Sequence, residues 1–266
     1  MRRSVTALAL VALSLLPAQA QWTPLFNGKN LDNFDIAYAS QPVDGRPASA
    51  LFEVRDGEIH AYRNEKAGSR QPAAYFQTRD AHRDFVLHLE YKWGDNKFAP
   101  RMHRVMDAGV VFHIYETKPN DWPHGVECQI EDTNTADLWL LSATADIAVK
   151  PATKRVVPDP LQNNSPYYAP DGRATTLGGY KKYVRVRHAA ARLEKPGWNS
   201  VDVVVRSDSA VYLVNGQVGM RLSNMKKWDA KRWVRLDKGK ILFQAEYAQI
   251  SYRNIKIRPV TESDPR

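Results

Sequence analysis

Three hydrogen-bonding side chains alternate with apolar ones in the stretch 126–131. Glu127, Gln129 and Glu131 occupy every second position, and the residues between them are Val, Cys and Ile. Successive side chains of a β-strand point to opposite faces, so this spacing places two carboxylates and an amide on one face. Carboxylates can exchange protons with a bound molecule, and an amide can orient its polar groups. The stretch therefore predicts a strand that carries acid–base chemistry.

Two other stretches, 108–115 and 241–247, alternate with the same period. One face of each carries the following residues: Gly109, Val111, His113 and Tyr115 from the first, and Leu242, Gln244 and Glu246 from the second. We interpret these residues as the hydrated face of a sheet that forms a groove for an extended sugar. The alternative is an ordinary solvent-exposed face without a binding role. Aromatic rings at expected strand ends favour the groove because they stack on sugar rings, although each also fits a core position. These rings are Trp122, Trp139 and Trp198.

The elements that position these side chains are predicted to be strands along almost the whole chain. β-Branched and aromatic residues fill the stretches 84–93, 108–115, 125–132, 199–206, 210–222, 239–247 and 248–260. Asn215-Gly216 and Asp56-Gly57 predict tight hairpins, because such pairs favour type I′ turns. No long apolar stripe with helical spacing follows the N-terminal segment. The pattern predicts an all-β fold of two packed antiparallel sheets, a sandwich or jelly roll.

Residues 150–179 differ from the rest of the chain because they are rich in proline and end in Gly178-Gly179. We predict a long Pro/Gly-rich surface loop here, which forms a wall or lid over the groove. Loops of this length within compact domains are usually functional. We find no second domain and predict a single β-sandwich domain over residues 21–262.

The first twenty residues have the three parts of a secretory signal peptide. Arg2 and Arg3 precede an apolar run over 5–16, and Ala18-Gln19-Ala20 offers a cleavage site. The run is short for a bilayer span, although an uncleaved N-terminal anchor is the alternative. Cys128, the only cysteine, cannot form an internal disulfide, and its apolar neighbours predict a core position. We predict a signal peptide over 1–20 and a periplasmic or secreted protein.

The formal charge of +9 falls to +7 once Arg2 and Arg3 are removed with the signal peptide. Basic residues are scattered in short clusters such as Lys181-Lys182 and Arg185–Arg187. Nucleic-acid binding requires a concentrated stripe or a recognisable module, so we predict no nucleic-acid partner. The charge fits a solvated surface or attraction to anionic sugars. No later segment could insert into a membrane, and the sequence carries no signal for an oligomeric state.

Several blocks of the sequence resemble the 3-keto-disaccharide hydrolase domain family. The opening WTPLFNGKNLDNF matches the family's W-x-x-L-F-N-G-K-x-L-x-x-W, with Phe34 in place of the last tryptophan. Further blocks are DAGVVFHIY, VECQIEDTNTADLW, VYLVNGQVG and GKILFQAEYAQISYRNIKIRPV. The resemblance spans nearly the whole chain after the signal peptide. It implies a concanavalin A-like jelly roll, export, and action on carbohydrates, namely glycosides already oxidised at C3 of a sugar ring.

The resemblance also implies site residues, carried over position by position. The matching positions in this chain are Lys97, Arg101, His113, Glu127, Gln129, Gln244 and Glu246. Besides Phe34, the chain departs from the family in two further blocks. The usual N/D-S-G turn reads Asp107-Ala108-Gly109, and the usual P-G-E-W-N lacks its glutamate at 196–199.

The chemistry that the resemblance implies starts from the ketone at C3, which acidifies the proton on C2. A base removes this proton, the aglycone leaves from C1, and water adds across the enone, so the net result is hydrolysis. The reaction needs a base, a donor or cation for the enolate oxygen, and an acid for the leaving oxygen. We assign the base to Glu127 or His113 and the acid to Glu246. Lys97, Arg101 or a bound metal would face the enolate, and other sugar contacts would come from Gln129, Glu131, Trp139 and Gln244.

Other interpretations of the same residues stay open. The run E-C-Q-I-E is similar to the E-x-D-x-E strand of retaining β-glucanases, in which two glutamates act as nucleophile and acid/base, although Gln129 replaces the aspartate. A lectin-like module would bind polysaccharide without cleaving it. His113 also fits a buried core histidine, and Arg101 a surface ion pair. No cofactor is certain, but a divalent metal such as calcium fits the oxygen ligands of Glu131, Asp132 and Asp137, whereas no zinc motif is present.

The export prediction can be checked directly. We expect the mature protein to begin at Gln21 and to lie outside the cytoplasm. N-terminal sequencing of the protein from its native host measures this, and a cytoplasmic protein that retains Met1 would contradict it.

Overall fold

The computed structural model describes residues 20–150, 165–188 and 192–266, and two antiparallel sheets dominate them. The predicted signal peptide lies outside the described residues except for Ala20. The larger sheet contains β1 (Thr23–Pro24), β3 (Phe52–Arg55), β4 (Glu58–Ala61), β6 (Phe85–Lys97), β10 (Ala143–Lys150), β11 (Tyr167–Tyr168), β12 (Arg173–Gly178), β14 (Asn199–Arg206), β15 (Ser209–Val214), β16 (Gln217–Asp229), β17 (Arg232–Arg235) and β19 (Ala248–Pro259).

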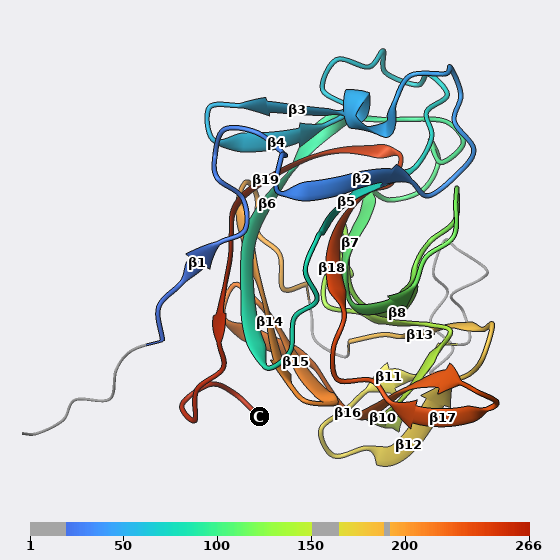
Figure 1. Cartoon of the computed structure of the whole chain (residues 1–266), viewed down its shortest axis with the longest axis vertical. Coiled ribbons are helices and arrows are strands. Elements are labelled where there is room, and N and C mark those ends of the chain that lie inside the picture. Colours follow the sequence, from blue (N-terminus) through green and yellow to red (C-terminus); the bar gives the residue numbers. More distant parts are fainter. Residues whose placement is uncertain (1–19, 151–164, 189–191) are drawn as a thin grey trace, which may run out of the picture.

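The smaller sheet carries the stretches singled out for acid–base chemistry. Its strand order is β13-β9-β8-β7-β18-β5-β2. The strands are β2 (Phe34–Tyr38), β5 (Ala74–Thr78), β7 (Asp107–Glu116), β8 (His124–Glu131), β9 (Leu138–Leu141), β13 (Tyr183–Val186) and β18 (Lys240–Ala245). A short 3-10 helix, η1 (Ala48–Leu51), lies between β2 and β3. Figure 1 shows the two sheets side by side, with β6, β14 and β15 in one layer and β7, β8 and β18 in the other.

Both predicted hairpins are confirmed. Asn215 and Gly216 join β15 to β16 with φ angles of 50° and 78°, and Asp56 and Gly57 join β3 to β4 with 53° and 77°. Two consecutive positive φ angles are what a type I′ turn requires, and Asn, Asp and Gly tolerate them best.

The prediction of one long loop over 150–179 is wrong for its second half. Residues 151–164 lie outside the described residues, but β11 and β12 follow and both pair with β10. Pro166 precedes β11, and Pro170 lies between the two strands, so neither proline removes a ladder hydrogen bond. The β-branched pair Thr175 and Thr176 then suits the strand β12.

The core between the sheets includes a cluster of aromatic rings. Phe76 and Phe243 of the smaller sheet stack with ring centroids 5.0 Å apart. Phe52 and Tyr252 of the larger sheet meet Phe76 edge-on at 5.5 and 5.9 Å. Such offset and edge-on pairs contribute beyond the area that they bury. Cys128 is fully buried in the same core, as predicted.

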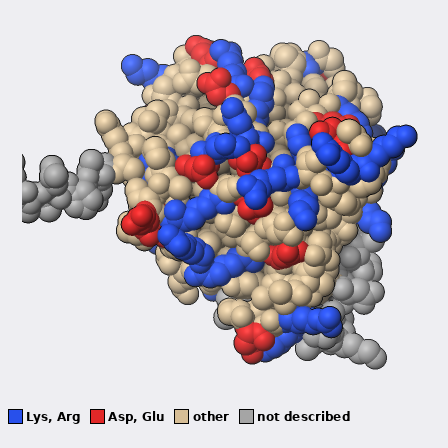
Figure 2. Space-filling view, turned by 60° about the horizontal axis from the view of Figure 1, so that its bottom comes forward, with Lys and Arg blue, Asp and Glu red and all other residues tan. Residues whose placement is uncertain are grey.

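The basic residues form no single stripe on the face shown in Figure 2. Acidic side chains lie among the lysines and arginines there. Within the described part of the chain, no helix has the length and apolar character needed to cross a bilayer.

The aromatic cluster gives a stability prediction. Phe243→Ala should lower the free energy of unfolding by about 3–5 kcal/mol, because it removes a ring that is fully buried between the sheets and leaves a cavity. Urea denaturation measures the change. Val105→Ala removes an exposed apolar side chain and serves as the control. Equal midpoints for the two variants would contradict the prediction.

Candidate active site

One face of the smaller sheet points away from the larger sheet, and we call it the outer face. Val126, Cys128 and Ile130 of β8 pack into the core, so Glu127, Gln129 and Glu131 occupy the outer face. This confirms the alternation predicted from the sequence. All three side chains are nevertheless buried, so the outer face is not the wet surface that the pattern suggested.

Antiparallel register aligns the outer-face residues of β8, β7 and β18 in rows across the sheet. Glu127 lies opposite Val111, Gln129 opposite Gly109, and Glu131 opposite Asp107. On the far side of β7, Leu242 pairs with Val111 and Glu246 bridges to Asp107. Side chains separated by more than a hundred residues in the sequence therefore become neighbours, because residues directly opposite each other on one face of a sheet are close enough for contact.

Gly109 makes room for the central pair of side chains. A Cβ atom at Gly109 would lie 2.1 Å from Oε1 of Glu127 and 2.8 Å from Oε1 of Gln244. Both distances are far below van der Waals contact. The two side chains therefore meet above the glycine, and a hydrogen bond joins them.

Two arginines hold the other carboxylates in pairs. Arg101 contacts Asp107 and Glu246, each with an N–O distance of 2.6 Å. Arg185 contacts Glu131 at 2.5 Å and Asp137 at 2.7 Å. A guanidinium group can serve two carboxylates because it presents five donors in one plane. We call the five acidic residues the carboxylate cluster: Asp107, Glu127, Glu131, Asp137 and Glu246.

Burial and mutual repulsion within the carboxylate cluster raise the pKa of three of its members. Burial raises the pKa of Glu127 to about 8, and the charge of Glu246 adds to this effect. Burial, followed by the charge of Glu246, also raises the pKa of Asp107 well above its usual range. Burial raises the pKa of Glu246 itself, although Arg101 opposes the shift. Desolvation penalises the charged form of each group. Carboxyl groups on the outer face therefore retain protons near neutral pH.

An apolar and aromatic strip borders the carboxylate cluster on the same face. Its buried members include Tyr75, Val111 and Leu242, and Trp122, Trp139 and Tyr247 pack against it. Trp139 pairs with Glu127 across the β8–β9 ladder, and the Arg185 guanidinium lies 5.6 Å from its ring centroid. Rings beside carboxylates and arginines form a surface that suits a sugar, which has one apolar face and many hydroxyl groups.

The family assignment follows from a comparison of the whole chain. A family model described as the 3-keto-alpha-glucoside-1,2-lyase-like domain matches residues 21–258. The chain belongs to this family. The motifs of the sequence indicated the same family, and membership makes the chain a carbohydrate-active protein. A search of curated protein sequences finds no match.

Solved structures with a similar fold include two candidate glycosyl hydrolases from Parabacteroides distasonis ATCC 8503. One is 20% identical and covers 90% of this chain and 100% of its own, with a TM-score of 0.51. The other is 18% identical and covers 90% and 94%, also with a TM-score of 0.51. The β-glucanase of Bacillus licheniformis is 10% identical, covers 92% and 100%, and has a TM-score of 0.44. At 18–20% identity the likeness to the two Parabacteroides proteins concerns the fold alone. The two antiparallel sheets confirm the predicted all-β, two-sheet jelly roll.

The structure brings most of the predicted site residues together. These are Arg101, Glu127, Gln129, Glu131, Trp139, Gln244 and Glu246. Gln129 donates a hydrogen bond of 2.5 Å to Asp107, so it orders the cluster itself. Lys97 does not contact the carboxylates, because its Nζ donates to the carbonyl oxygen of Arg104 at 2.7 Å. Lys97 therefore supports the segment that follows Arg101.

His113 lies outside the carboxylate cluster. Strand β7 has a register shift between Phe112 and Glu116, and His113 itself has a φ angle of 53°. A bulge of this kind breaks the two-residue period, so the side chain does not follow Gly109 and Val111 onto the outer face. His113 instead packs near Phe85 and Phe112, and burial lowers its pKa to about 4. It is a buried histidine, as the alternative interpretation held.

Trp198 is also remote from the cluster. The guanidinium of Arg253 lies 3.9 Å from its ring centroid, and the ammonium of Lys92 lies 4.8 Å away. Both partners belong to the larger sheet. The expectation that Trp198 lines the groove is therefore wrong.

Asp107 and Asp137 of the carboxylate cluster, and Arg185 which contacts it, were not predicted as acid–base or sugar-binding residues. Asp107 is the first residue of β7, in the block that departs from the family pattern. Arg185 occupies the outer face of β13, with Val184 and Val186 pointing into the core. The alternation Tyr-Val-Arg-Val-Arg over 183–187 was the signal that could have identified it.

The three proposed calcium ligands do not converge. Arg185 binds both Glu131 and Asp137, whereas Asp132 contacts Arg192 at 2.7 Å. Across residues 20–150, 165–188 and 192–266, no group of three His, Cys, Asp or Glu side chains could hold a metal ion. A metal requirement stays a prediction that elemental analysis of the purified protein can test.

The raised pKa of Glu127 predicts a dependence of stability on pH. The folded protein retains a proton up to about pH 8, whereas an ordinary glutamate loses it near 4.5. Stability therefore falls as the pH rises through this window, because the folded state binds more protons than the unfolded state. Glu127→Gln should remove this loss, so its stability relative to the natural protein should grow by roughly one to several kcal/mol from pH 4.5 to 8.

Urea denaturation across this pH range measures the effect. Glu90→Gln is the matched control, because hydrogen bonds from Asn254 and Arg253 outweigh burial and lower the pKa of Glu90. The control curve should run parallel to that of the natural protein above pH 4.5. A parallel curve for Glu127→Gln as well would show that Glu127 ionises normally.

Proposed function

We propose that the chain is a glycoside-cleaving enzyme that acts on 3-keto-glycosides by removing the C2 proton and expelling the group at C1. The observation that carries this proposal is the environment of Glu127. It is 5% exposed, its pKa is raised to about 8, and it forms no ion pair with any described residue. A carboxylate without a cation is a stronger base than one bound to arginine. Family membership supports the substrate class.

The proposed elimination moves one proton at each end of the reacting bonds. Glu127 takes the proton from C2, and the electrons of the C–H bond form the C1=C2 double bond. The bond from C1 to the leaving oxygen breaks, and that oxygen takes a proton from Glu246. Arg101 and Arg185 lie beside these carboxylates and stabilise negative charge as it develops on the enolate oxygen.

The hydration step reverses the two proton transfers. Water adds to C1 of the enone and gives a proton to Glu246, while Glu127 returns its proton to C2. Both carboxyl groups regain their starting states, and the net reaction is hydrolysis. Release of the enone before hydration would make the enzyme a lyase, and analysis of the sugar product distinguishes the two outcomes. We further propose that the reaction takes place outside the cytoplasm, as the N-terminal segment predicts.

A retaining glycosidase mechanism is less compatible with the contacts of Glu131. Such a mechanism needs one of two glutamates to donate a proton to the leaving oxygen. Arg185 donates hydrogen bonds to both carboxylate oxygens of Glu131, so these oxygens are already engaged within the protein. A comparison of a 3-keto-glycoside with its unoxidised parent tests this. Cleavage of the parent would support the glucanase interpretation, and binding without any cleavage would support a lectin-like module.

We expect Glu127→Gln to lower kcat/KM by about 10²–10⁴-fold while the protein still folds and binds a keto-sugar, because the amide keeps the shape and loses the basicity. The natural enzyme should gain activity as the pH rises towards about 8, since Glu127 must be ionised to accept a proton. The variant should lack this dependence. Initial rates with a 3-keto-glycoside between pH 5 and about 9 measure both effects.

A second measurement tests removal of the C2 proton without departure of the leaving group. The 3-keto-sugar product exchanges its C2 proton with deuterium in D₂O if the base is active, and NMR follows the exchange. Glu127→Gln should abolish the catalysed exchange, whereas Glu90→Gln should not change it. Exchange at the natural rate in Glu127→Gln would assign the base to another group.

A further inference from the structure

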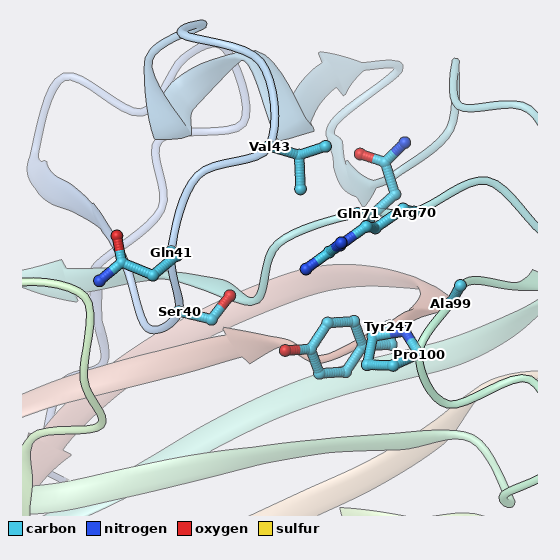
Figure 3. Close-up of a pocket in the computed structure, with 8 residues that line it drawn as sticks. All are labelled: Ser40, Gln41, Val43, Arg70, Gln71, Ala99, Pro100 and Tyr247. Atoms are coloured by element: carbon cyan, nitrogen blue, oxygen red, sulfur yellow. The ribbon is translucent and has the colours of Figure 1, made fainter.

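A pocket of about 500 Å³ lies beside the carboxylate cluster. The residues that line it include Ser40, Gln41, Val43, Arg70, Gln71 and Tyr247, and Figure 3 shows them around one space. They come from the segment after β2, the segment before β5 and the residue that follows Glu246. A pocket of this size suits a small molecule or one part of a larger substrate.

The pocket shares a wall with the carboxylate cluster. Tyr247 lines the pocket, and the guanidinium of Arg101 lies 5.2 Å from its ring centroid. The same guanidinium holds Glu246, the proposed acid for the leaving oxygen. A group that departs from C1 next to Glu246 therefore lies on the side of the cluster where the pocket is found.

Arg70 is the charged side chain that distinguishes this pocket. It is exposed and makes no ion pair or side-chain hydrogen bond with the described residues. Figure 3 shows its guanidinium group extending into the space above the ring of Tyr247. Arg46, by contrast, contacts both Asp44 and Glu65 at 2.7 and 2.8 Å. A guanidinium group that faces a pocket without a carboxylate partner is suited to bind an oxyanion.

The wall around Arg70 is ordered before any ligand binds. Gln71 is 6% exposed, and its Nε2 donates to Glu65 at 2.8 Å and to Ser69 at 2.9 Å. Across the pocket, the Ser40 hydroxyl oxygen accepts a hydrogen bond of 2.9 Å from the backbone N–H of Ala73. The hydroxyl hydrogen of Ser40 is then available to a ligand acceptor. The pocket thus offers two donors, from Ser40 and Arg70, to an acceptor-rich group.

We propose that this pocket receives the leaving group of the cleaved glycoside and that Arg70 selects leaving groups that carry a carboxylate or a similar oxyanion. The proposal rests on the proposed function for the identity of the leaving group. It makes Arg70 a specificity-determining residue that contacts the substrate at a distance from the reacting bonds.

Two substrates that differ mainly in the charge of the leaving group test the selection. They are 3-keto-glucosides whose leaving groups are 4-hydroxybenzoate and 4-hydroxybenzamide, which have nearly the same shape. The natural enzyme should have a higher kcat/KM for the benzoate. Arg70→Ala should lower the benzoate-to-benzamide ratio by about tenfold to a hundredfold, the usual effect of losing a hydrogen bond to a charged group. Arg70→Lys should retain part of the preference. Arg55→Ala removes an exposed arginine elsewhere and should leave the ratio unchanged.

Binding of the free phenols separates this proposal from the proposed function. An NMR titration with 4-hydroxybenzoate and 4-hydroxybenzamide needs no cleavage, and the benzoate should bind more tightly through Arg70. If the natural enzyme cleaves neither glucoside yet shows this Arg70-dependent binding, the proposed reaction is wrong and the anion site stands. If the enzyme cleaves both glucosides with equal kcat/KM, or if Arg70→Ala behaves like Arg55→Ala in both measurements, the selection by Arg70 is wrong.

Discussion

The candidate site depends on one constraint, which is the burial of more carboxyl groups than cations on a single sheet face. Arg101 and Arg185 each contact two of the five carboxyl groups at 2.5–2.7 Å, and Arg187 lies 4.0 Å from Asp137. An ionised carboxylate loses its hydration when it is buried, at a cost of several kcal/mol unless a partner compensates for it. Arg101 and Arg185 each compensate for two carboxylates in part. The remaining excess of negative charge is relieved by retained protons, which is why burial and neighbouring charge raise the pKa of Asp107, Glu127 and Glu246.

The register of the sheet determines which carboxylates receive an arginine. Asp107 and Glu246 end neighbouring strands in one row, so one guanidinium group from the loop after β6 reaches both. Glu131 lies opposite Asp107 in the same row, and Glu131 and Asp137 are within reach of Arg185 on β13. Glu127 lies four residues before Glu131 on the same face, in a row with Val111 and Leu242. Its cross-strand neighbours on that side are apolar, so the middle of the face holds the carboxylate that has no cation.

Local patterns predicted much of the fold and about half of this site. The two-residue period of β8 and β18 placed Glu127, Gln129 and Gln244 correctly, because each strand has one apolar face in the core. The same period failed for His113, since a bulge inside β7 inserts an extra residue that no local pattern marks. Arg185 could be recognised as a strand residue, but its partners depend on pairing between β9 and β13, which are far apart in the sequence. Long-range pairing of this kind is not encoded in any short segment.

The absence of a cation beside Glu127 has opposite consequences for stability and for chemistry. An arginine there would stabilise the folded protein near neutral pH, but it would also lower the pKa of the carboxyl group and weaken it as a base. The fold tolerates the unpaired group because the strand beneath it is held firmly. Val126 and Cys128 on either side are fully buried, and the hydroxyl of Tyr212 donates to the backbone oxygen of Glu127 at 3.3 Å. The core between the sheets thus fixes the position of a side chain that is itself destabilising, as a base positioned for one proton of a bound sugar requires.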